Sequence, residues 1–184
     1  MKHVERADLL DWVTWSERRG ALRERVMAAK AVRRVHIGDY LTLLFENAET
    51  IRYQVQEMMR VERIAREADI RRELDTYNEL LGGDGELGCT LLVEIEDPIE
   101  RDAKLRRWRE LPARVYAELE DGRRIHARAD ERQIGADRLS SVQYLKFATG
   151  GAVPVAVGTD LPELAAETKL SAEQRAALRE DLVP

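Results

Sequence analysis

Glu62 is the carboxylate in this sequence with the strongest claim to chemistry, because a helix over residues 47–65 would place it among apolar side chains. At about 100° per residue, the face that Glu62 joins is formed by Ala48, Ile51, Val55, Met58, Met59 and Ala65. A lone carboxylate there is costly unless it is paired or hydrogen-bonded. We favour a structural ion pair with an arginine such as Arg34, and the alternative is a catalytic acid or base that lines a pocket.

Polar side chains on the same helix and on the strand before it form a candidate anion site. Arg52 and Gln56 are one helical turn apart and could jointly hold a carboxylate or a phosphate. The other candidate ligand-binding residues are Arg34, His36 and Arg60. The favoured alternative is an exposed helix face on which Gln56 and Arg60 pair with each other.

No metal-binding or cofactor motif accompanies these residues. His3, His36 and His126 lack the spacing of metal ligands, so a two-histidine site requires a fold that brings His36 and His126 together. Cys89 is the single cysteine, which excludes an internal disulfide and a multi-cysteine metal centre. Its place on an apolar strand favours inert packing. We therefore expect no metal and no cofactor.

Charge and hydropathy exclude further classes of protein. The net charge is −5, and although residues 18–34 are basic, aromatic residues for base stacking are scarce, so nucleic-acid binding is not expected. The 25 arginines against 5 lysines could serve anion recognition, but codon bias is the favoured explanation. No apolar run approaches about 20 residues, and the charged N-terminus lacks the apolar core of a secretion signal. We expect a cytoplasmic protein without a membrane span.

The elements that must position the candidate residues are predicted from capping and turn signals. Two helices, over residues 8–15 and 17–31, make up an N-terminal helical segment. A mixed sheet and helix body is expected over 32–160, and a tail with a helix over 161–184, all in a single globular domain. Because strands and helices do not alternate regularly, the sequence predicts an α+β fold with one mainly antiparallel sheet of about five to seven strands and helices packed on it.

Local signals locate several turns and helix ends. Gly38 and Asp39 separate two β-like segments and predict a hairpin, and Asp97 followed by Pro98 predicts a helix start. A second hairpin is predicted with a three-residue loop in which Gly122 is left-handed. Pro154 confines the segment that follows it to a sheet edge.

Four blocks of the sequence resemble the bacterial family catalogued as domain of unknown function 3501. They are RRVHIGDYLTLLFENAETIRYQVQEMMRVERI, ELDTYNELL, TLLVEIED and SSVQYLKF, which occur in this order over most of the chain. The resemblance implies a bacterial single-domain protein and no particular activity. Relatives look to be encoded near rubrerythrin-like and iron–sulfur oxidoreductase genes, which implies a redox or oxidative-stress context.

A C-terminal Gly-x-Asp-His-Pro-like motif belongs to the same resemblance. It stands here as Gly158-Thr159-Asp160-Leu161-Pro162, with leucine in place of histidine, and we interpret it as a turn.

Two functions stay open. The favoured one is a non-catalytic binding or accessory protein with a protein partner or a second copy of itself, which predicts a flat surface patch and no deep polar pocket. The alternative is a small enzyme or sensor that binds an anionic metabolite through Arg52 or Arg34, with Glu62 as the acid or base. It predicts a cleft lined by Glu62, Arg52 and His36.

Overall fold

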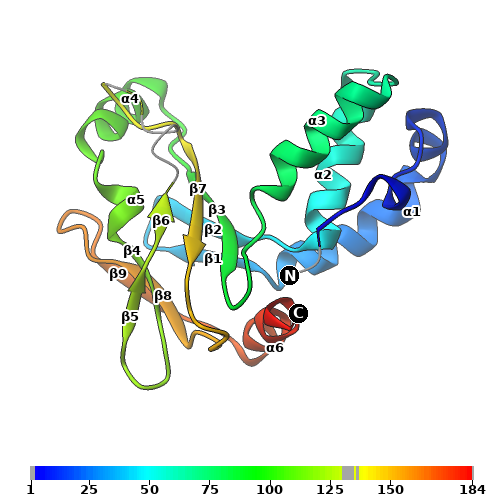
Figure 1. The fold of residues 1–184 in the computed structure, drawn as a ribbon. Coiled ribbons are helices and arrows are strands. Elements are labelled where there is room, and N and C mark those ends of the chain that lie inside the picture. The colour runs from blue at the N-terminus through cyan, green and yellow to red at the C-terminus, as the bar shows by residue number, and fades with distance from the viewer. Residues whose placement is uncertain (1–2, 130–134, 136, 184) are drawn as a thin grey trace.

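Two antiparallel sheets and a group of N-terminal helices make up the fold (Figure 1). The computed structural model describes residues 3–129, 135 and 137–183. The large sheet contains, in spatial order, β1 (Arg34–Ile37), β2 (Leu41–Phe45), β3 (Leu87–Val93), β7 (Val142–Phe147) and β6 (Arg128–Ala129). The small sheet contains β5 (Arg124–His126), β4 (Val115–Glu118), β8 (Ala156–Thr159) and β9 (Ala166–Lys169). The predicted α+β class is confirmed, whereas the prediction of a single sheet is wrong.

The N-terminal helices stand to one side of the sheets (Figure 1). They are a short 3-10 helix, η1 (Arg6–Asp8), followed by α1 (Trp12–Ala31), α2 (Ala48–Val61) and α3 (Glu67–Asn78). α1 is one helix, so the predicted break near Ser16 is wrong. It begins at Asp11, whose carboxylate accepts hydrogen bonds from the backbone N–H groups of Val13 and Thr14. Gly20 continues the helix without interruption.

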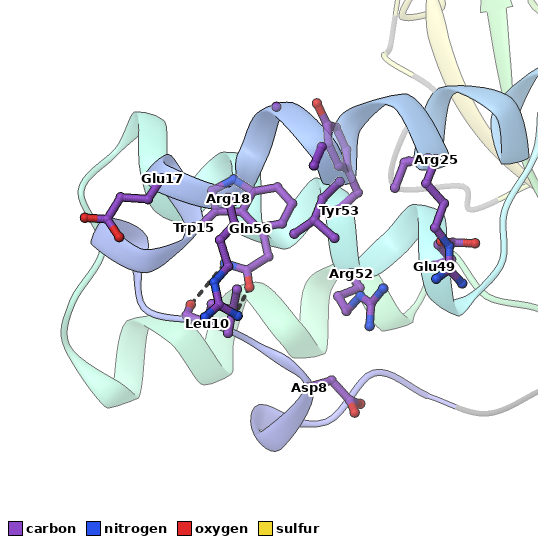
Figure 2. Close-up of a pocket in the computed structure, with 14 residues that line it drawn as sticks. Asp8, Leu10, Trp15, Glu17, Arg18, Arg25, Glu49, Arg52, Tyr53 and Gln56 are labelled. Carbon is purple, nitrogen blue, oxygen red and sulfur yellow. Dashed lines mark hydrogen bonds and ion pairs between the residues drawn. The ribbon is translucent and has the colours of Figure 1, made fainter.

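Separate apolar clusters hold these helices together. α2 and α3 share a cluster with the N-terminal segment, formed by Val4, Leu9, Ile51, Val55, Met59, Ile70, Leu74 and Leu81. α1 and α2 meet through Trp15, Val26 and Tyr53 (Figure 2). The rings of Trp15 and Tyr53 lie edge to face with their centroids 5.7 Å apart, an arrangement that favours aromatic pairs. The N-terminal helices therefore have apolar cores of their own.

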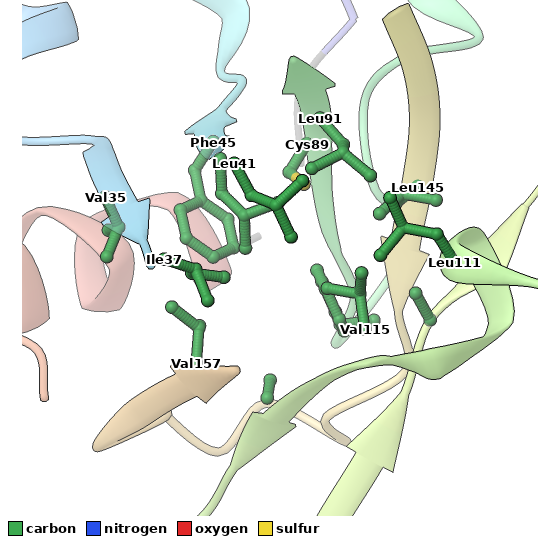
Figure 3. Packing of buried hydrophobic residues seen from close by; sticks show 14 of the residues in the cluster. Val35, Ile37, Leu41, Phe45, Cys89, Leu91, Leu111, Val115, Leu145 and Val157 are labelled. Atoms are coloured by element: carbon green, nitrogen blue, oxygen red, sulfur yellow. The ribbon is translucent and has the colours of Figure 1, made fainter. Parts of the chain in front are cut away.

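The main core lies between the two sheets (Figure 3). Alternate residues of the large sheet point inward, among them Ile37, Phe45 and Leu91, and they face Val115 and Val157 of the small sheet. Each sheet is apolar on one face, so stacking the sheets removes both faces from water. This packing requirement is the physical reason why two sheets form.

The predicted hairpins agree with the structure. β1 pairs with β2 around Gly38, whose φ is 56°. β4 pairs with β5 in the predicted register, with Ala117 opposite Ile125, and Gly122 has a φ of 83°. The chain then passes from the small sheet to the large sheet at Ala127, between β5 and β6.

Three further helices complete the fold. α4 (Pro98–Arg107) begins at Asp97 as predicted, and α5 (Leu111–Arg114) follows it. α6 (Ala172–Leu182) begins at Ser171. No helix in the described ranges is both long and apolar enough to cross a membrane.

The edge strand predicted around Pro154 is an interior strand. β8 begins two residues after Pro154 and pairs with β4 on one side and β9 on the other. The proline precedes the ladder, so its missing N–H costs the sheet no hydrogen bond. β9 carried no clear sequence signal, because its residues alternate between half-buried and exposed positions.

Candidate functional site

Glu62 does not lie among core residues, because α2 ends before it. The last helical residue is Val61, and Glu62 is the C-cap. Arg63 adopts a left-handed conformation with φ of 53°, and the backbone N–H of Ile64 donates to the carbonyl oxygen of Met59 at 2.9 Å. This is the Schellman arrangement that terminates helices. It turns Glu62 away from the apolar face on which a longer helix would have placed it.

The buried ion pair expected for Glu62 occurs elsewhere. Glu62 is exposed and borders an open depression beside the start of α3, and Arg34 is exposed on β1. The neighbour of Arg34 is the buried residue: Arg33 donates from Nε and Nη2 to the two carboxylate oxygens of Asp181, at 2.7 and 2.9 Å. Asn47 donates to the same carboxylate at 3.2 Å. The prediction of a Glu62–Arg34 ion pair is wrong, because Arg33 and not Arg34 faces the core.

A pocket of about 480 Å³ lies between the N-terminal segment, α1 and α2 (Figure 2). Its apolar wall is formed by Leu10, Ala21, Leu22, Val26, Trp15 and Tyr53. Its other lining residues are Asp8, Glu17, Arg18, Gly20, Arg25, Glu49, Arg52 and Gln56. Two of the predicted ligand-binding residues, Arg52 and Gln56, therefore line one pocket, while Arg34, His36 and Arg60 are not among its lining residues.

Gln56 is a structural residue of this pocket. Its side chain is buried, accepts the backbone N–H of Leu10 at 2.6 Å and donates to the carbonyl oxygen of Leu10 at 3.0 Å. Both ends of the amide are thus occupied by the N-terminal segment, as Figure 2 shows. Gln56 builds the wall of the pocket and is not available to hold a ligand.

Arg52 is the half-buried cation of the pocket that has no protein partner. Its side chain forms no hydrogen bond or ion pair with any other residue that the structure describes. Arg25, by contrast, lies with Nε 2.7 Å from Oε1 of Glu49. Arg18 lines the same pocket but is exposed. An anion that enters the pocket would therefore find the guanidinium of Arg52 free for bidentate hydrogen bonding.

Arg60 forms an ion pair with Glu57, which does not line the pocket. The carboxylate of Glu57 accepts hydrogen bonds from Trp15 Nε1 and Arg19 Nε, both at 2.8 Å, and from Arg60 Nη2 at 3.2 Å. Burial opposes ionisation of this carboxylate, but the three donors outweigh it and lower the pKa of Glu57 to about 2. Glu57 therefore fixes Trp15 in the apolar wall and holds Arg60 through Nη2, whereas the buried Nε of Arg60 has no hydrogen-bond partner among the described residues.

The two histidines of a hypothetical metal site lie on different sheets. His36 is on β1, with Nδ1 2.8 Å from Oγ1 of Thr42, whereas His126 is on β5 of the small sheet. In the described part of the chain, no three His, Cys, Asp or Glu side chains gather in a way that could hold a metal ion.

A polar cluster on the outer face of the small sheet was not foreseen. His126 Nε2 lies 2.8 Å from Asp160 Oδ2, and Tyr116 Oη donates to Glu167 Oε2 at 2.9 Å. Burial and the hydrogen bond to Glu167 raise the pKa of Tyr116 to about 12. The hairpin register placed Tyr116 opposite His126, but Asp160 and Glu167 reach them only through strand pairings that are distant in sequence.

The motif that contains Gly158 and Asp160 belongs partly to a strand. Gly158 and Thr159 lie in β8, so the interpretation of this segment as a turn is wrong for them. A Cβ on Gly158 would lie 2.5 Å from Tyr116 Oη, so only glycine allows the phenol to cross the strand. We assign these residues a structural role.

Comparison with known proteins identifies the family of this chain. The chain belongs to the family described as "Protein of unknown function (DUF3501)", which matches residues 3–182. The fold is similar to a crystal structure described as a novel protein of unknown function from Burkholderia pseudomallei. The two chains are 33% identical, with a TM-score of 0.91 over 99% of this chain and 100% of the other. Among the curated proteins, no match was found.

Proposed function

We propose that this protein is a non-catalytic binding protein whose site is the pocket between α1, α2 and the N-terminal segment. The observation that carries the proposal is Arg52, a half-buried arginine in a pocket with an apolar wall, whose side chain has no partner among the residues that the structure describes. An arginine in such surroundings is suited to an anionic group, because its guanidinium is weakly hydrated and offers paired donors. The ligand is therefore a small molecule with an anionic group.

The residues that line the pocket support binding over catalysis. None of them is a histidine, cysteine, serine or threonine. Of the carboxylates, Asp8 and Glu17 are exposed, and Glu49 is held by Arg25. General acid–base catalysis needs a titratable group beside the reacting atoms, and Glu62 is not among the lining residues.

An accessory role in redox or oxidative-stress metabolism, in the cytoplasm, is part of the proposal. Such a role would act through a protein partner or a second copy of the chain, not through the chain's own thiol. Cys89 is buried in β3, and burial raises the pKa of its thiol well above the ordinary value. A neutral, enclosed thiol is a poor nucleophile.

The test is a thermal-shift screen with small anions. The wild-type protein is melted with millimolar carboxylates, phosphates and sulfonates, beside Arg52→Gln, Arg23→Gln and Glu62→Gln. Arg23 is exposed on α1 and does not line the pocket, so Arg23→Gln controls for the loss of one positive charge. We expect at least one anion to raise the Tm of the wild type, Arg23→Gln and Glu62→Gln, but not of Arg52→Gln.

Two results would overturn the proposal. One is that no anion raises the Tm of the wild-type protein, and the other is that Arg52→Gln responds as strongly as Arg23→Gln. Loss of the response in Glu62→Gln would instead restore the enzyme hypothesis. The Tm of each variant without ligand shows whether its fold is intact.

A further inference from the structure

We infer that the ligand of this pocket is a monocarboxylate with an apolar chain, held at its head by Arg52 and given room for its chain by Gly20. The inference rests on the proposed function and names the chemical class of its ligand. Three independent properties of the pocket carry it: the balance of charges, the apolar wall and a glycine inside a helix.

The charges that line the pocket select for a single negative charge. Asp8, Glu17 and Glu49 oppose Arg18, Arg25 and Arg52, so the lining has no net charge. Glu49 neutralises Arg25, and Arg52 is the half-buried cation left over. A nucleotide or another polyanion would place further negative groups near Asp8 and Glu17, and such like-charge contacts reject wrong ligands.

The apolar wall is suited to a hydrocarbon chain. Trp15 and Val26 are buried, and Tyr53 packs edge to face on Trp15, so these side chains form a fixed surface beside Arg52. The volume of about 480 Å³ lies within the range of small-molecule sites. Each methylene group removed from water by such a wall should strengthen binding by roughly fourfold. A ligand that is only a charged head group would leave this surface unused.

Gly20 keeps space open in the wall formed by α1. It lies inside a helix of 20 residues, where glycine is less favourable than alanine. Its backbone needs no special conformation, since it is helical and is not at a cap. Gly20 is exposed and lines the pocket, and a Cβ built on it would meet no atom within 4 Å, so a side chain at this position would project into open space. The absent side chain therefore leaves room for a ligand.

Isothermal titration calorimetry of the full chain with saturated acids of increasing length tests the inference. The probes are butanoate, hexanoate and octanoate, with methyl octanoate as the uncharged analogue and octanedioate as the dianion. We expect affinity to rise by about fourfold for each added methylene group. Methyl octanoate and octanedioate should each bind at least tenfold more weakly than octanoate.

Gly20→Leu and Ala28→Leu form a matched pair of variants. Both introduce a leucine at an exposed position of α1, but Gly20 lines the pocket and Ala28 does not. Gly20→Leu should weaken octanoate binding at least tenfold and leave butanoate binding within twofold. Ala28→Leu should bind both acids like the wild type. Circular dichroism of both variants tests whether their helices are kept.

The results separate the two proposals. If anions bind in an Arg52-dependent manner but chain length has no effect, the chain-binding inference fails and the proposed function stands. Tighter binding of octanedioate, or unchanged octanoate binding by Gly20→Leu, would also contradict the inference. If no anion binds at all, both proposals fail.

Discussion

The side-chain amide of Gln56 hydrogen bonds with both backbone groups of Leu10, as a neighbouring strand would. The N–H of Leu10 donates to Oε1 at 2.6 Å, and Nε2 donates to the carbonyl oxygen at 3.0 Å. Asn78 makes the same pair of bonds with Val4, both at 2.9 Å. Two amides from α2 and α3 thus hold the N-terminal segment, which forms one wall of the pocket.

Replacing Gln56 should release this segment. Gln56→Leu would leave two backbone groups of Leu10 without partners, and each such group costs about 1–3 kcal/mol if it stays buried. We expect the free energy of unfolding to fall by about 2–4 kcal/mol in urea titrations. Amide hydrogen exchange of residues 4–10 should accelerate most. A loss below about 0.5 kcal/mol would show that the amide does not hold the segment.

Glu57 should make the free energy of unfolding depend on pH in the acidic range. Its folded pKa of about 2 lies below the ordinary value of 4.5, so its stabilising contribution is complete above pH 4.5 and is lost as the pH falls toward 2. We expect this carboxylate to account for about 1–3 kcal/mol of the loss, measured by urea unfolding at pH 5, 4, 3 and 2.5.

Glu57→Gln should flatten this acid dependence and lower stability at pH 7. Glu62→Gln is the matched control at the end of the same helix, because Glu62 is exposed and its side chain makes no hydrogen bond or ion pair with another described residue. It should titrate like the wild type. Equal pH profiles for Glu57→Gln and the wild type would contradict the role of Glu57.

Removing one partner of the buried pair Arg33–Asp181 should lower the free energy of unfolding strongly, whereas replacing both partners with apolar residues should change it little. Asp181→Ala leaves the guanidinium of Arg33 buried without its counter-ion, so we expect a loss of about 3–5 kcal/mol. The double variant Arg33→Met/Asp181→Leu removes both charges and should lie within about 1 kcal/mol of the wild type. Urea unfolding of Arg33→Met, Asp181→Leu and the double variant gives the coupling energy. Additive losses would show that the two side chains act independently.

Local signals predicted the elements of this fold better than their assembly. Gly38, Asp97 and Gly122 act through backbone conformation or capping within a few residues, and the structure confirms all three. The pairing of β4 with β8 joins segments about 40 residues apart and has no local signal. The division into two sheets follows from it, so the sequence alone favoured one.

In the candidate site, too, local spacing was predictable from the sequence and tertiary packing was not. The spacing of Arg52 and Gln56 brought both into one pocket, because they share a turn of α2. The opposite wall comes from α1 and from Leu10, which only tertiary packing places there. Glu62 was misplaced because an arginine, not a glycine, occupies the left-handed position after α2.

Arg63 should therefore be a position where the protein can be stabilised. A left-handed conformation costs a residue with a side chain about 1–2 kcal/mol, whereas glycine adopts it freely but loses about 0.5–1 kcal/mol of backbone entropy on folding. We expect Arg63→Gly to raise the free energy of unfolding by about 0.5–1 kcal/mol in urea titrations.

Arg71→Gly is the matched control for Arg63→Gly, because Arg71 is exposed in the interior of α3. There glycine has no left-handed strain to relieve, and stability should fall by about 1 kcal/mol. The two substitutions remove the same side chain, so their opposite signs would isolate the backbone conformation of Arg63 as the cause. A loss of stability in both variants would mean that the Arg63 side chain stabilises the end of α2 by more than its conformation costs.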